Sequence, residues 1–572
     1  MKSINRSAIF PLIALVILVI ALSQHMFSIT SFGKIFDPFI GAVQNGGDRL
    51  LERRTWKGSE LGLSDSVSVV FDDRKVPHIY AKNTDDLYFT QGYVTAYLRL
   101  WQMDFLSYLS AGRLSEIFGQ NGTLDYDRLQ RRAGILQAAK ESVKLMEQDP
   151  ETNKVLEAYT KGVNAYISKL DYKTMPLEYK FLNYTPEPWT KLKTALIMKY
   201  MANTLSGFEE DLGVSKLMIA LGEQKFNQLF PEFSLYMSPV VSSKDVMKKS
   251  VMAYTKKPDY LDYSFLSSGS VIAQSTYNPR LGSNSWVVSG KKTKSGFPIL
   301  CNDPHLTLSL PAIWMEMQLT SPDQNVYGVS IPGTPAVIIG FNENIAWGIT
   351  NGADDVKDWY KLKVTDDYKR YELDGKWLDL KYTSEEIKVR GTKPFYDTIY
   401  RSVQGPLMFT KNFPGFQPEL VNHAMRWELH NPSNEFLCFI KLNKAKNYAE
   451  YQQAITNFST PLQNFTFAGK DGTIAVNHQG RLPVKWPGQG KFILDGTTSA
   501  HLYTKYIPFD SMPHTVNPSS DYIVTANQRP TDSNYKYYYN GYFTEHRANR
   551  IKQILVAENQ FDIEKMEKMQ LD

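Results

Sequence analysis

The chain has 572 residues, of which 42% are hydrophobic and 13% aromatic, enough for two or more structural units or one large interwoven unit. Its formal net charge is only +5, from 64 basic and 59 acidic residues, without a long stripe of lysine and arginine. Because nucleic-acid binding requires a strong positive surface, we expect no nucleic-acid partner.

The N-terminal residues have the pattern of an export signal. Lys2 and Arg6 precede an apolar run from Ala8 to Leu22, and Ala21-Leu22-Ser23 offers a cleavage site with small residues. The run is shorter than the roughly 20 residues that cross a bilayer comfortably. We therefore expect residues 1–25 to be a cleaved signal peptide, with an uncleaved membrane anchor as the alternative. The mature protein would then be periplasmic, or anchored facing outside the cytoplasm.

After the N-terminus, strand-like and helical patterns alternate. Val67 to Phe71 and His78 to Tyr80 predict short strands on either side of turn residues. Asp86 to Ile117 and Leu192 to Leu205 predict helices, because apolar residues recur there at intervals of three and four. We therefore expect residues 26–245 to form a mostly helical first part.

Residues 246–282 resemble a linker, with serines among lysines and tyrosines and little periodicity. The sequence beyond them is rich in predicted strands. These strands are Trp286 to Val288, Ile299 to Cys301, Ala336 to Ile339, Ile345 to Ile349, and a hairpin of Phe465 to Phe467 with Thr473 to Val476 around Asp471-Gly472. A helical first part followed by a strand-rich part from 283 to 572 indicates an α+β fold.

The two cysteines, Cys301 and Cys438, lie far apart in the sequence and show no C-x-x-C spacing. They exclude a zinc cluster and a disulfide framework. We expect two buried free thiols, with a single bridge as the alternative in an exported protein.

Familiar hydrolase motifs are missing from the sequence. The nearest string to G-x-S-x-G is Gly328-Val329-Ser330-Ile331-Pro332, which lacks the last glycine, and neither an H-E-x-x-H helix nor a P-loop occurs. A Ser-His-Asp enzyme therefore has no motif to support it, although nine histidines leave it open. The string Gly282-Ser283-Asn284-Ser285-Trp286 instead joins a small, polar junction to a predicted strand. By itself, such a string is most often a turn before a strand.

Several ordered blocks accompany this junction. Before the linker they are Asp72 to Ile79, Gln91-Gly92-Tyr93, Arg99 to Met103 and Gly112 to Glu116; after it they are Gly282 to Trp286, Asn302 to Leu306, Trp347 to Asn351, Asp355 to Asp358 and Thr525 to Pro530. With these blocks the chain resembles the penicillin acylase family of N-terminal-nucleophile hydrolases over nearly its whole exported length.

The resemblance implies an αββα sandwich of antiparallel sheets with a largely helical first chain. It also implies a precursor that cuts itself between Gly282 and Ser283, releases residues 246–282 and leaves two chains folded together as a heterodimer. The substrate would be a small molecule with an N-acyl amide bond, and no organic cofactor is expected.

The chemistry of an N-terminal serine is consistent with this expectation. An internal serine hydroxyl is a weak nucleophile that needs an adjacent base. A free α-amino group has a pKa of about 8 and would lie on Ser283 itself after cleavage. The cut would thus supply the base, acting through a water molecule, and no catalytic histidine would be needed.

The resemblance assigns roles to four further residues. The backbone N–H of Asn351 and the side-chain amide of Asn527 would stabilise the oxyanion, at about 3 kcal/mol per donor. Arg547 would help to hold the active site, and His305 would tune the α-amine of Ser283. The alternatives are turn residues for the asparagines, a solvated charge for Arg547 and a structural histidine for His305.

Metal and acyl-group sites are also implied. Asp355 and Asp358 would join Asp211 of the first part in a structural calcium site, since carboxylate oxygens suit this hard cation. The alternative for these acids is exposed loops. Thr204 and Leu205 would line the acyl pocket, or else form an ordinary helix face.

Two features depart from the family pattern. Ser285 stands where many members have a second asparagine, and we expect the family fold to continue beyond Asp572, so that the chain is truncated. Three functions remain open. The first is an acylase that cleaves an amide such as that of a β-lactam antibiotic or an acyl-homoserine lactone. The others are an inactive fragment or binding protein, and a serine hydrolase that uses a histidine.

Overall fold

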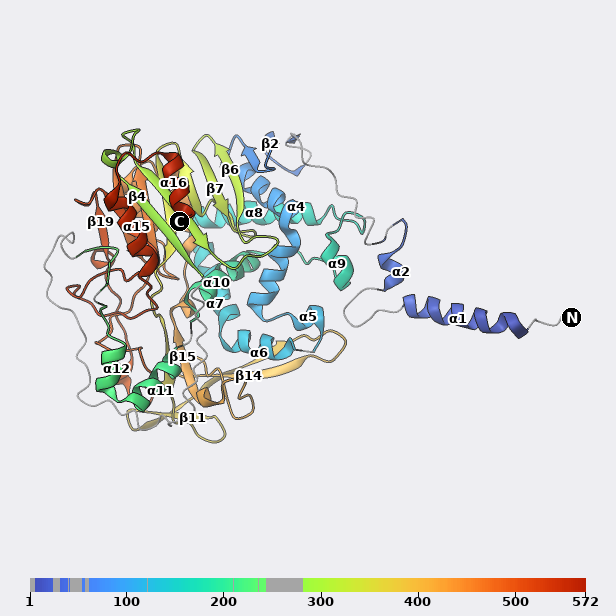
Figure 1. Cartoon of the computed structure of the whole chain (residues 1–572). Helices are drawn as coiled ribbons and strands as arrows, with labels where there is room; N and C mark the ends of the chain where they lie inside the picture. The colour runs from blue at the N-terminus through green and yellow to red at the C-terminus, as the bar shows by residue number, and fades with distance from the viewer. Residues whose placement is uncertain are drawn as a thin grey trace.

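The computed structural model describes residues 6–23, 31–39, 41, 54–56, 61–120, 122–208, 210–234, 236–242 and 281–572. The predicted spacer, except its last two residues, lies outside this part of the chain, as does the end of the predicted signal peptide. The apolar run forms helix α1 (Arg6–Ser23), which projects from the rest of the chain (Figure 1). None of the helices in the described ranges combines the length and the apolar character needed to cross a membrane.

Helix α4 (Thr84–Ala111) is the longest helix of the first part. The Asn83 side chain caps its start by accepting a hydrogen bond from the Asp86 N–H, and Gly112 ends it with a left-handed φ of 63°. The predicted helix from Asp86 to Ile117 is therefore divided, because α5 (Ser115–Phe118) begins separately after the glycine.

Helix α8 (Pro150–Ile167) packs along α4 at very short range. A Cβ atom at Gly162 would lie 1.8 Å from the carbonyl oxygen of Phe89, so only glycine fits there. The remaining helices of the first part are α2 (Phe32–Ile35), α6 (Leu124–Arg132), α7 (Ile135–Gln148), α9 (Leu177–Leu182), α10 (Lys191–Ser206), α11 (Asp211–Leu221) and α12 (Glu223–Leu229). The helix predicted from Leu192 to Leu205 is confirmed as α10.

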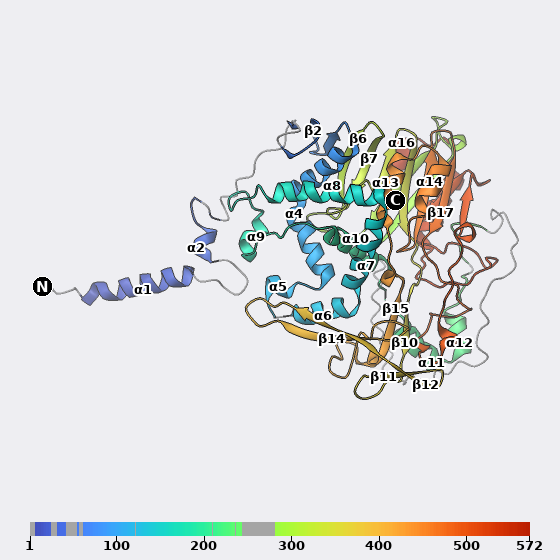
Figure 2. The ribbon, with the colours of Figure 1, turned by 180° about the vertical axis from the view of Figure 1, so that it is seen from behind.

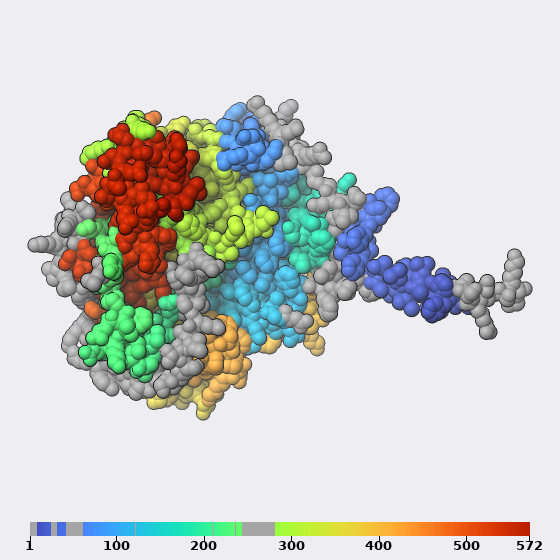
Figure 3. Space-filling model, viewed as in Figure 1, coloured from blue at the N-terminus to red at the C-terminus, as the bar shows by residue number. Residues whose placement is uncertain are grey.

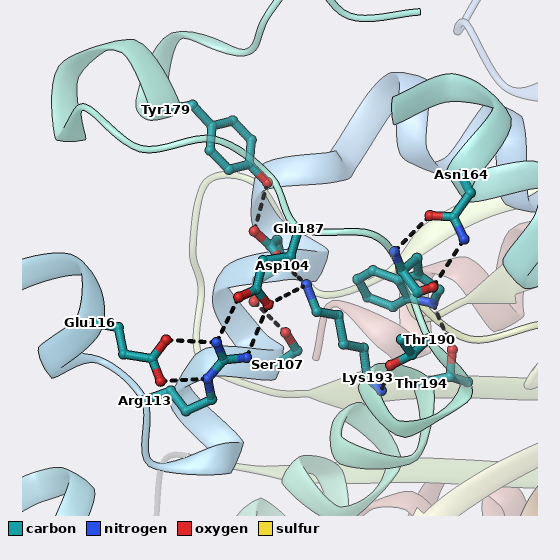
Figure 4. Close-up of polar contacts among 11 residues, drawn as sticks. Asp104, Ser107, Arg113, Glu116, Asn164, Tyr179, Glu187, Thr190, Lys193 and Thr194 are labelled. Carbon is teal, nitrogen blue, oxygen red and sulfur yellow. Dashed lines mark hydrogen bonds and ion pairs between the residues drawn. The ribbon is translucent and has the colours of Figure 1, made fainter. Parts of the chain in front are cut away.

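Buried charges tie three of these helices together (Figure 4). Lys193 of α10 donates to the carboxylate of Asp104 of α4 at 2.6 Å, and Tyr179 of α9 donates to the same carboxylate at 3.0 Å. Next to them, the Arg113 hydrogen bond holds the pKa of Glu187 at about 2. The helical layer is therefore fixed by polar contacts as well as by its apolar core.

The first and second parts share one ten-stranded sheet. Its order is β1-β2-β3-β6-β7-β8-β9-β16-β17-β19, and neighbours are antiparallel except the parallel pair β3 and β6. The strands are β1 (Arg54–Trp56), β2 (Val67–Phe71), β3 (Pro77–Tyr80), β6 (Met315–Ser321), β7 (Gln324–Ser330), β8 (Ile339–Asn342), β9 (Ile345–Asn351), β16 (Gln463–Gly469), β17 (Ile474–Gln479) and β19 (His514–Val516).

Most of the predicted strands are confirmed, and one is wrong. The segment predicted as a strand from Ala336 to Ile339 is irregular until β8 begins at Ile339, and Ala336 has a left-handed φ of 71°. Its apolar residues are buried against the helices without strand pairing, because Gln91 and Asn443 satisfy the backbone N–H groups of Ala336 and Val337.

A second sheet, in the order β20-β4-β5, faces the first. It consists of β4 (Gly282–Val288), β5 (Ile299–His305) and β20 (Tyr522–Thr525). Side chains alternate along β4 with a period of two. Trp286 and Val288 pack in the core cluster with α15 (His546–Ala557) and α16 (Ile563–Gln570). The Ser285 hydroxyl faces the ten-stranded sheet, where it contacts that of Thr466 at 2.8 Å.

Four layers result from this packing. Helices α4, α8, α13 (Glu435–Lys444) and α14 (Tyr448–Ile455) cover the outer face of the ten-stranded sheet, and α15 and α16 cover the small sheet. Figure 1 shows α15 and α16 beside β4, and Figure 2 brings α8, α13 and α14 toward the viewer. The predicted α+β sandwich is confirmed.

Smaller elements extend the fold beside these layers. One is a three-stranded sheet of β15 (His423–Trp427), β10 (Lys357–Lys361) and β18 (Leu494–Asp495). Two are hairpins, β11 (Arg370–Leu373) with β12 (Lys376–Asp379) and β13 (Lys381–Ile387) with β14 (Phe395–Arg401). The short 3-10 helices are η1 (Gly290–Lys292), η2 (Pro418–Leu420), η3 (Glu428–His430), η4 (Ser499–His501) and η5 (Phe509–Ser511). Figure 3 shows the green surface of α11 and α12 beside the red C-terminal residues. The two parts are thus interwoven.

Both cysteines are free and buried, as predicted. Cys301 lies in the core between the small sheet and the C-terminal helices, and Cys438 of α13 lies in the core between the ten-stranded sheet and the helices that cover it. Burial raises the pKa of the Cys301 thiol to about 12, so this thiol is protonated at neutral pH.

Candidate active site

Ser283 is the second residue of β4, and the alternation along this strand turns its side chain toward the ten-stranded sheet. The residue is only 4% exposed. Its backbone N–H donates to the Asn527 side-chain oxygen at 2.8 Å. The nitrogen that would become the α-amine is therefore already held by a side chain from the loop after β20.

Gly282, the residue before the predicted cut, has no room for a side chain. A Cβ atom at this position would lie 2.5 Å from Nη2 of Arg547 and 2.7 Å from Oδ1 of Asn527. The glycine is therefore explained by close approach of the site residues rather than by its backbone angles.

Two N–H donors converge on the Ser283 hydroxyl oxygen. The backbone N–H of Asn351, at the end of β9, lies 3.1 Å from this oxygen, and the Asn527 side-chain amide lies 3.2 Å from it. These are the two groups predicted to stabilise an oxyanion, and the structure brings both to the hydroxyl of the predicted nucleophile. Asn527 has a left-handed φ of 64°, which asparagine tolerates better than most residues.

Arg547 fixes the orientation of the Asn527 amide. Its guanidinium donates to Oδ1 of Asn527 at 2.7 Å and to the carbonyl oxygen of Ser283 at 2.8 Å. Because Oδ1 faces Arg547 and the Ser283 N–H, the amide Nδ2 must face the hydroxyl of Ser283. Arg547 also donates to the Asn284 side chain at 2.5 Å. The sequence interpretation did not single out Asn284, although it adjoins Ser283.

His305 lies near this network but contacts other residues. Its Nε2 atom is 2.5 Å from the Asp303 carboxylate and 3.5 Å from the side-chain nitrogen of Asn284. Across the small sheet it pairs with Gly282. Among the described residues, no hydrogen bond joins the His305 side chain to Ser283, so the predicted tuning of the Ser283 amine would have to act through Asn284 and Arg547.

An apolar cavity of about 210 Å³ opens beside Ser283. Thr204 and Leu205, the predicted pocket residues, line it at the end of α10, together with the site residues Asn351 and Asn527. The rest of the lining comes mainly from the second part, which the sequence interpretation missed because these residues look like ordinary core positions. They are chiefly Trp314, Ile331, Ile338, Ile339, Ile349, Phe439 and Phe458.

The Asn351 side chain connects the cavity wall to the predicted oxyanion donor. Its Nδ2 donates to the carbonyl oxygen of Leu205 at 2.8 Å, near the end of α10. Its Oδ1 accepts from the Ala353 N–H at 3.2 Å. Asn351 thus supplies the backbone donor at Ser283 and also anchors the helix that lines the apolar cavity.

The predicted calcium ligands Asp211, Asp355 and Asp358 are buried near one another, and a lysine shares their site. Nζ of Lys485 donates to Oδ1 of Asp358 at 2.8 Å and to the Asp355 carbonyl oxygen at 3.3 Å. Burial raises the pKa of Asp355, whereas the Lys485 charge opposes this increase. In the described ranges, no group of three or more histidine, cysteine, aspartate or glutamate side chains is placed to hold a metal ion. The residues as arranged therefore do not fit calcium.

Comparisons with known proteins cover nearly the whole chain. The chain is 27% identical over 522 residues to an acyl-homoserine lactone acylase, QuiP, of Pseudomonas aeruginosa, covering 89% of this chain and 61% of the relative. It is 25% identical over 508 residues to the penicillin acylase 2 proenzyme of Pseudomonas sp. strain SE83 (88% and 64%), and 25% identical over 515 residues to the penicillin G acylase of Escherichia coli (82% and 60%). The chain thus spans 60–64% of the length of these relatives.

A solved structure, the thermostable penicillin G acylase from Alcaligenes faecalis in orthorhombic form, matches with a TM-score of 0.44 and 24% identity over 50% of this chain and 51% of that chain. The family model described as penicillin amidase matches residues 66–572, which is most of the chain. The chain therefore belongs to the penicillin amidase family.

Proposed function

We propose that this chain is the precursor of an amide hydrolase in which Ser283 is the nucleophile. The observation that carries the proposal is the convergence of two N–H donors on the Ser283 hydroxyl at the mouth of an apolar cavity. An amide hydrolase needs a nucleophile, oxyanion donors and an acyl-binding surface close together, and this arrangement of a hydroxyl, two N–H donors and an apolar cavity supports those roles. The names of the relatives, an acyl-homoserine lactone acylase and penicillin acylases, support the same reaction class.

In maturation, the Ser283 hydroxyl would first attack a peptide bond of its own chain. The hydroxyl oxygen attacks the Gly282 carbonyl carbon, the bond from this carbon to the Ser283 nitrogen breaks, and the nitrogen takes a proton. Water then hydrolyses the resulting ester, leaving a Gly282 carboxylate and a free α-amine on Ser283. The two chains, 26–245 and 283–572, would remain together as a heterodimer because their strands share one sheet.

Turnover would repeat the attack on the substrate amide. The α-amine, held by Oδ1 of Asn527, accepts the hydroxyl proton through a water molecule, and the hydroxyl oxygen bonds to the acyl carbon. The Asn351 N–H and the Asn527 amide stabilise the oxyanion. The amine product leaves with a proton, and water hydrolyses the acyl ester to release the acid.

The cavity supports an uncharged, apolar acyl group. The described residues that line it include no lysine, arginine, histidine, aspartate or glutamate. A glutaryl group would bring its carboxylate into this surface without a cationic partner, which costs several kcal/mol. We therefore favour phenylacetyl or fatty acyl amides, including the acyl-homoserine lactones named for the relatives, over glutaryl amides.

A substrate panel tests the acyl preference. Phenylacetyl, C4 to C12 acyl and glutaryl amides of one amine should be compared by kcat/KM, and we expect at least about 100-fold lower values for glutaryl than for the best apolar group. Equal turnover of glutaryl amides, or cleavage of ordinary peptides with none of the acyl amides hydrolysed, would contradict the proposal.

Variants of Ser283 test the mechanism. Ser283→Ala should give one uncut, inactive chain by intact-mass analysis, whereas Ser283→Cys should cut itself but turn over poorly, because a thiol replaces the hydroxyl. Ser289→Ala, in the same segment, is the matched control and should mature normally. Cleavage after Gly282 in the Ser283→Ala variant would refute the mechanism. An uncut wild-type chain without activity would favour the inactive-fragment alternative.

Export is part of the same proposal. The basic residues Lys2 and Arg6 and the apolar helix α1 support a signal peptide or an anchor at the N-terminus. Maturation would then take place outside the cytoplasm, and cell fractionation with N-terminal sequencing distinguishes a cleaved signal from an anchor.

A further inference from the structure

Four charged side chains are buried where α11 meets β10 and the loop after β17. Asp211 begins α11, and Asp355 and Asp358 lie before and within β10. The three acids are at most 4% exposed, and Lys485, from the loop, is 1% exposed. Buried carboxylates need a positive partner, because isolated charges are costly in a protein interior.

Three of the four carboxylate oxygens of Asp355 and Asp358 already accept hydrogen bonds. Calcium takes six to eight oxygen ligands at 2.3–2.6 Å. Here Oδ1 of Asp358 accepts from Lys485 at 2.8 Å, and Oδ1 of Asp355 accepts from the Lys357 N–H at 3.2 Å. Oδ2 of Asp355 accepts from the Asn540 amide at 2.7 Å. An ammonium ion and a divalent cation would repel one another strongly at this depth.

The surrounding backbone closes over the Lys485–Asp358 pair. A Cβ atom at Gly490 would lie 2.0 Å from Oδ1 of Asp358 and 2.5 Å from Nζ of Lys485, so this position accepts only glycine next to the pair. Oδ2 of Asp358 is buried and has no hydrogen-bond partner among the described side chains and backbone. It is the one carboxylate oxygen of Asp355 and Asp358 still open to a donor.

We propose that the ammonium group of Lys485 takes the structural role of a divalent cation in this chain. The packing of α11 against β10 and the loop after β17 then needs no metal ion. The lysine bonds to Asp358 directly and to the Asp355 carbonyl, and its charge also interacts with Asp211 of the first part. Because Asp355 follows the oxyanion donor Asn351 closely, this internal cation holds the oxyanion segment against α11.

The first experiment uses the wild-type chain and does not depend on amidase activity. Its metal content after purification without chelator and its Tm in excess EGTA or in 5 mM CaCl₂ should be measured. We expect less than about 0.1 calcium per chain and the same Tm in both solutions. One calcium per chain, with a Tm that falls when EGTA removes it, would overturn the proposal.

The second experiment replaces the internal cation. Lys485→Gln should lower Tm by about 3–5 °C, because it leaves buried carboxylates uncompensated. Calcium should then restore part of this loss, since the acids are freed to bind it. The exposed Lys505→Gln is the control and should change neither Tm nor its calcium dependence. A Lys485→Gln variant that is destabilised but insensitive to calcium would overturn the proposal that Lys485 takes the role of a divalent cation.

A double variant covers the case in which Lys485→Gln does not fold. Lys485→Gln combined with Asp358→Asn removes both charges of the pair and should recover much of the lost Tm. It should also lose the calcium response, because the best-placed carboxylate is gone. A double variant that also fails to fold, or that is less stable than a folded Lys485→Gln, would contradict the pairing of Lys485 with Asp358.

Discussion

At the scale of single residues, the site depends on orienting one amide. Asn527 presents Oδ1 to the Ser283 nitrogen and Nδ2 to the Ser283 hydroxyl, and Arg547 keeps the amide from turning over. In the proposed mechanism, this orientation gives both the α-amine base and the oxyanion a fixed partner, which electrostatic catalysis requires. The backbone N–H of Asn351 completes the pair of donors.

Removal of the Asn527 amide is the sharpest residue-scale test. Asn527→Ala should lower kcat by about 10²- to 10³-fold, because one oxyanion donor is lost and the α-amine loses its acceptor. Single-turnover kinetics with the preferred acyl amide should show the loss in the acylation step. Mature enzyme is required, so cleavage after Gly282 is checked by intact mass. A loss below about 5-fold would exclude Asn527 as an oxyanion donor.

At the scale of elements, the Asn351 side chain links β9 to α10. Asn351 ends β9, donates its backbone N–H to the Ser283 oxygen, and holds the carbonyl oxygen of Leu205 near the end of α10. In the proposed mechanism, the strand therefore carries an oxyanion donor and the helix carries part of the acyl pocket. Movement of α10 would displace both together.

Asn351→Ala tests this connection, since the variant keeps the backbone donor and loses only the side-chain link. We expect kcat/KM to fall by about 5- to 10-fold, the usual effect of one hydrogen bond, and far less than for Asn527→Ala. The exposed Asn559→Ala variant should behave as wild type. Equal losses in Asn351→Ala and Asn527→Ala would show that the side chain does more than anchor α10.

At the scale of the whole molecule, buried neutral histidines make stability depend on pH. His423 of β15 is 3% exposed, and burial lowers its pKa to about 4 from an ordinary value near 6.5. Between these values the unfolded state binds more protons than the folded state. The stabilising contribution of neutral, buried His423 is therefore complete above about pH 6.5 and is lost as the pH falls toward 4.

Thermal or urea unfolding at several pH values measures this contribution. Between pH 7 and 5 the wild-type chain should lose about 2 kcal/mol more of its free energy of unfolding than His423→Gln does, since His423→Gln has no such proton to take up. The exposed His546→Gln variant should keep the wild-type slope. Identical pH slopes for wild type and His423→Gln would show that His423 stays neutral in both states or charges without cost.

The sequence alone determined much of this fold because local patterns are sufficient for it. Strands such as β2 and the helix α10 follow from periods of two and of three to four, and the interval from Ser283 to Asn351 and Asn527 follows from a resemblance between ordered blocks. The segment from Ala336 misled the interpretation, since an apolar run reads alike whether it is paired in a sheet or buried in a loop.

Only the tertiary structure decided which distant residues meet. It placed the carbonyl oxygen of Leu205 on Asn351, turned His305 toward Asp303, and put the Lys485 ammonium beside Asp358. The sequence holds no periodic signal for such contacts, because a lysine that pairs with an acid over 100 positions away looks like any surface lysine. Whether buried acids are neutralised by a lysine of the chain or need a metal ion depends on which side chains the fold brings to them.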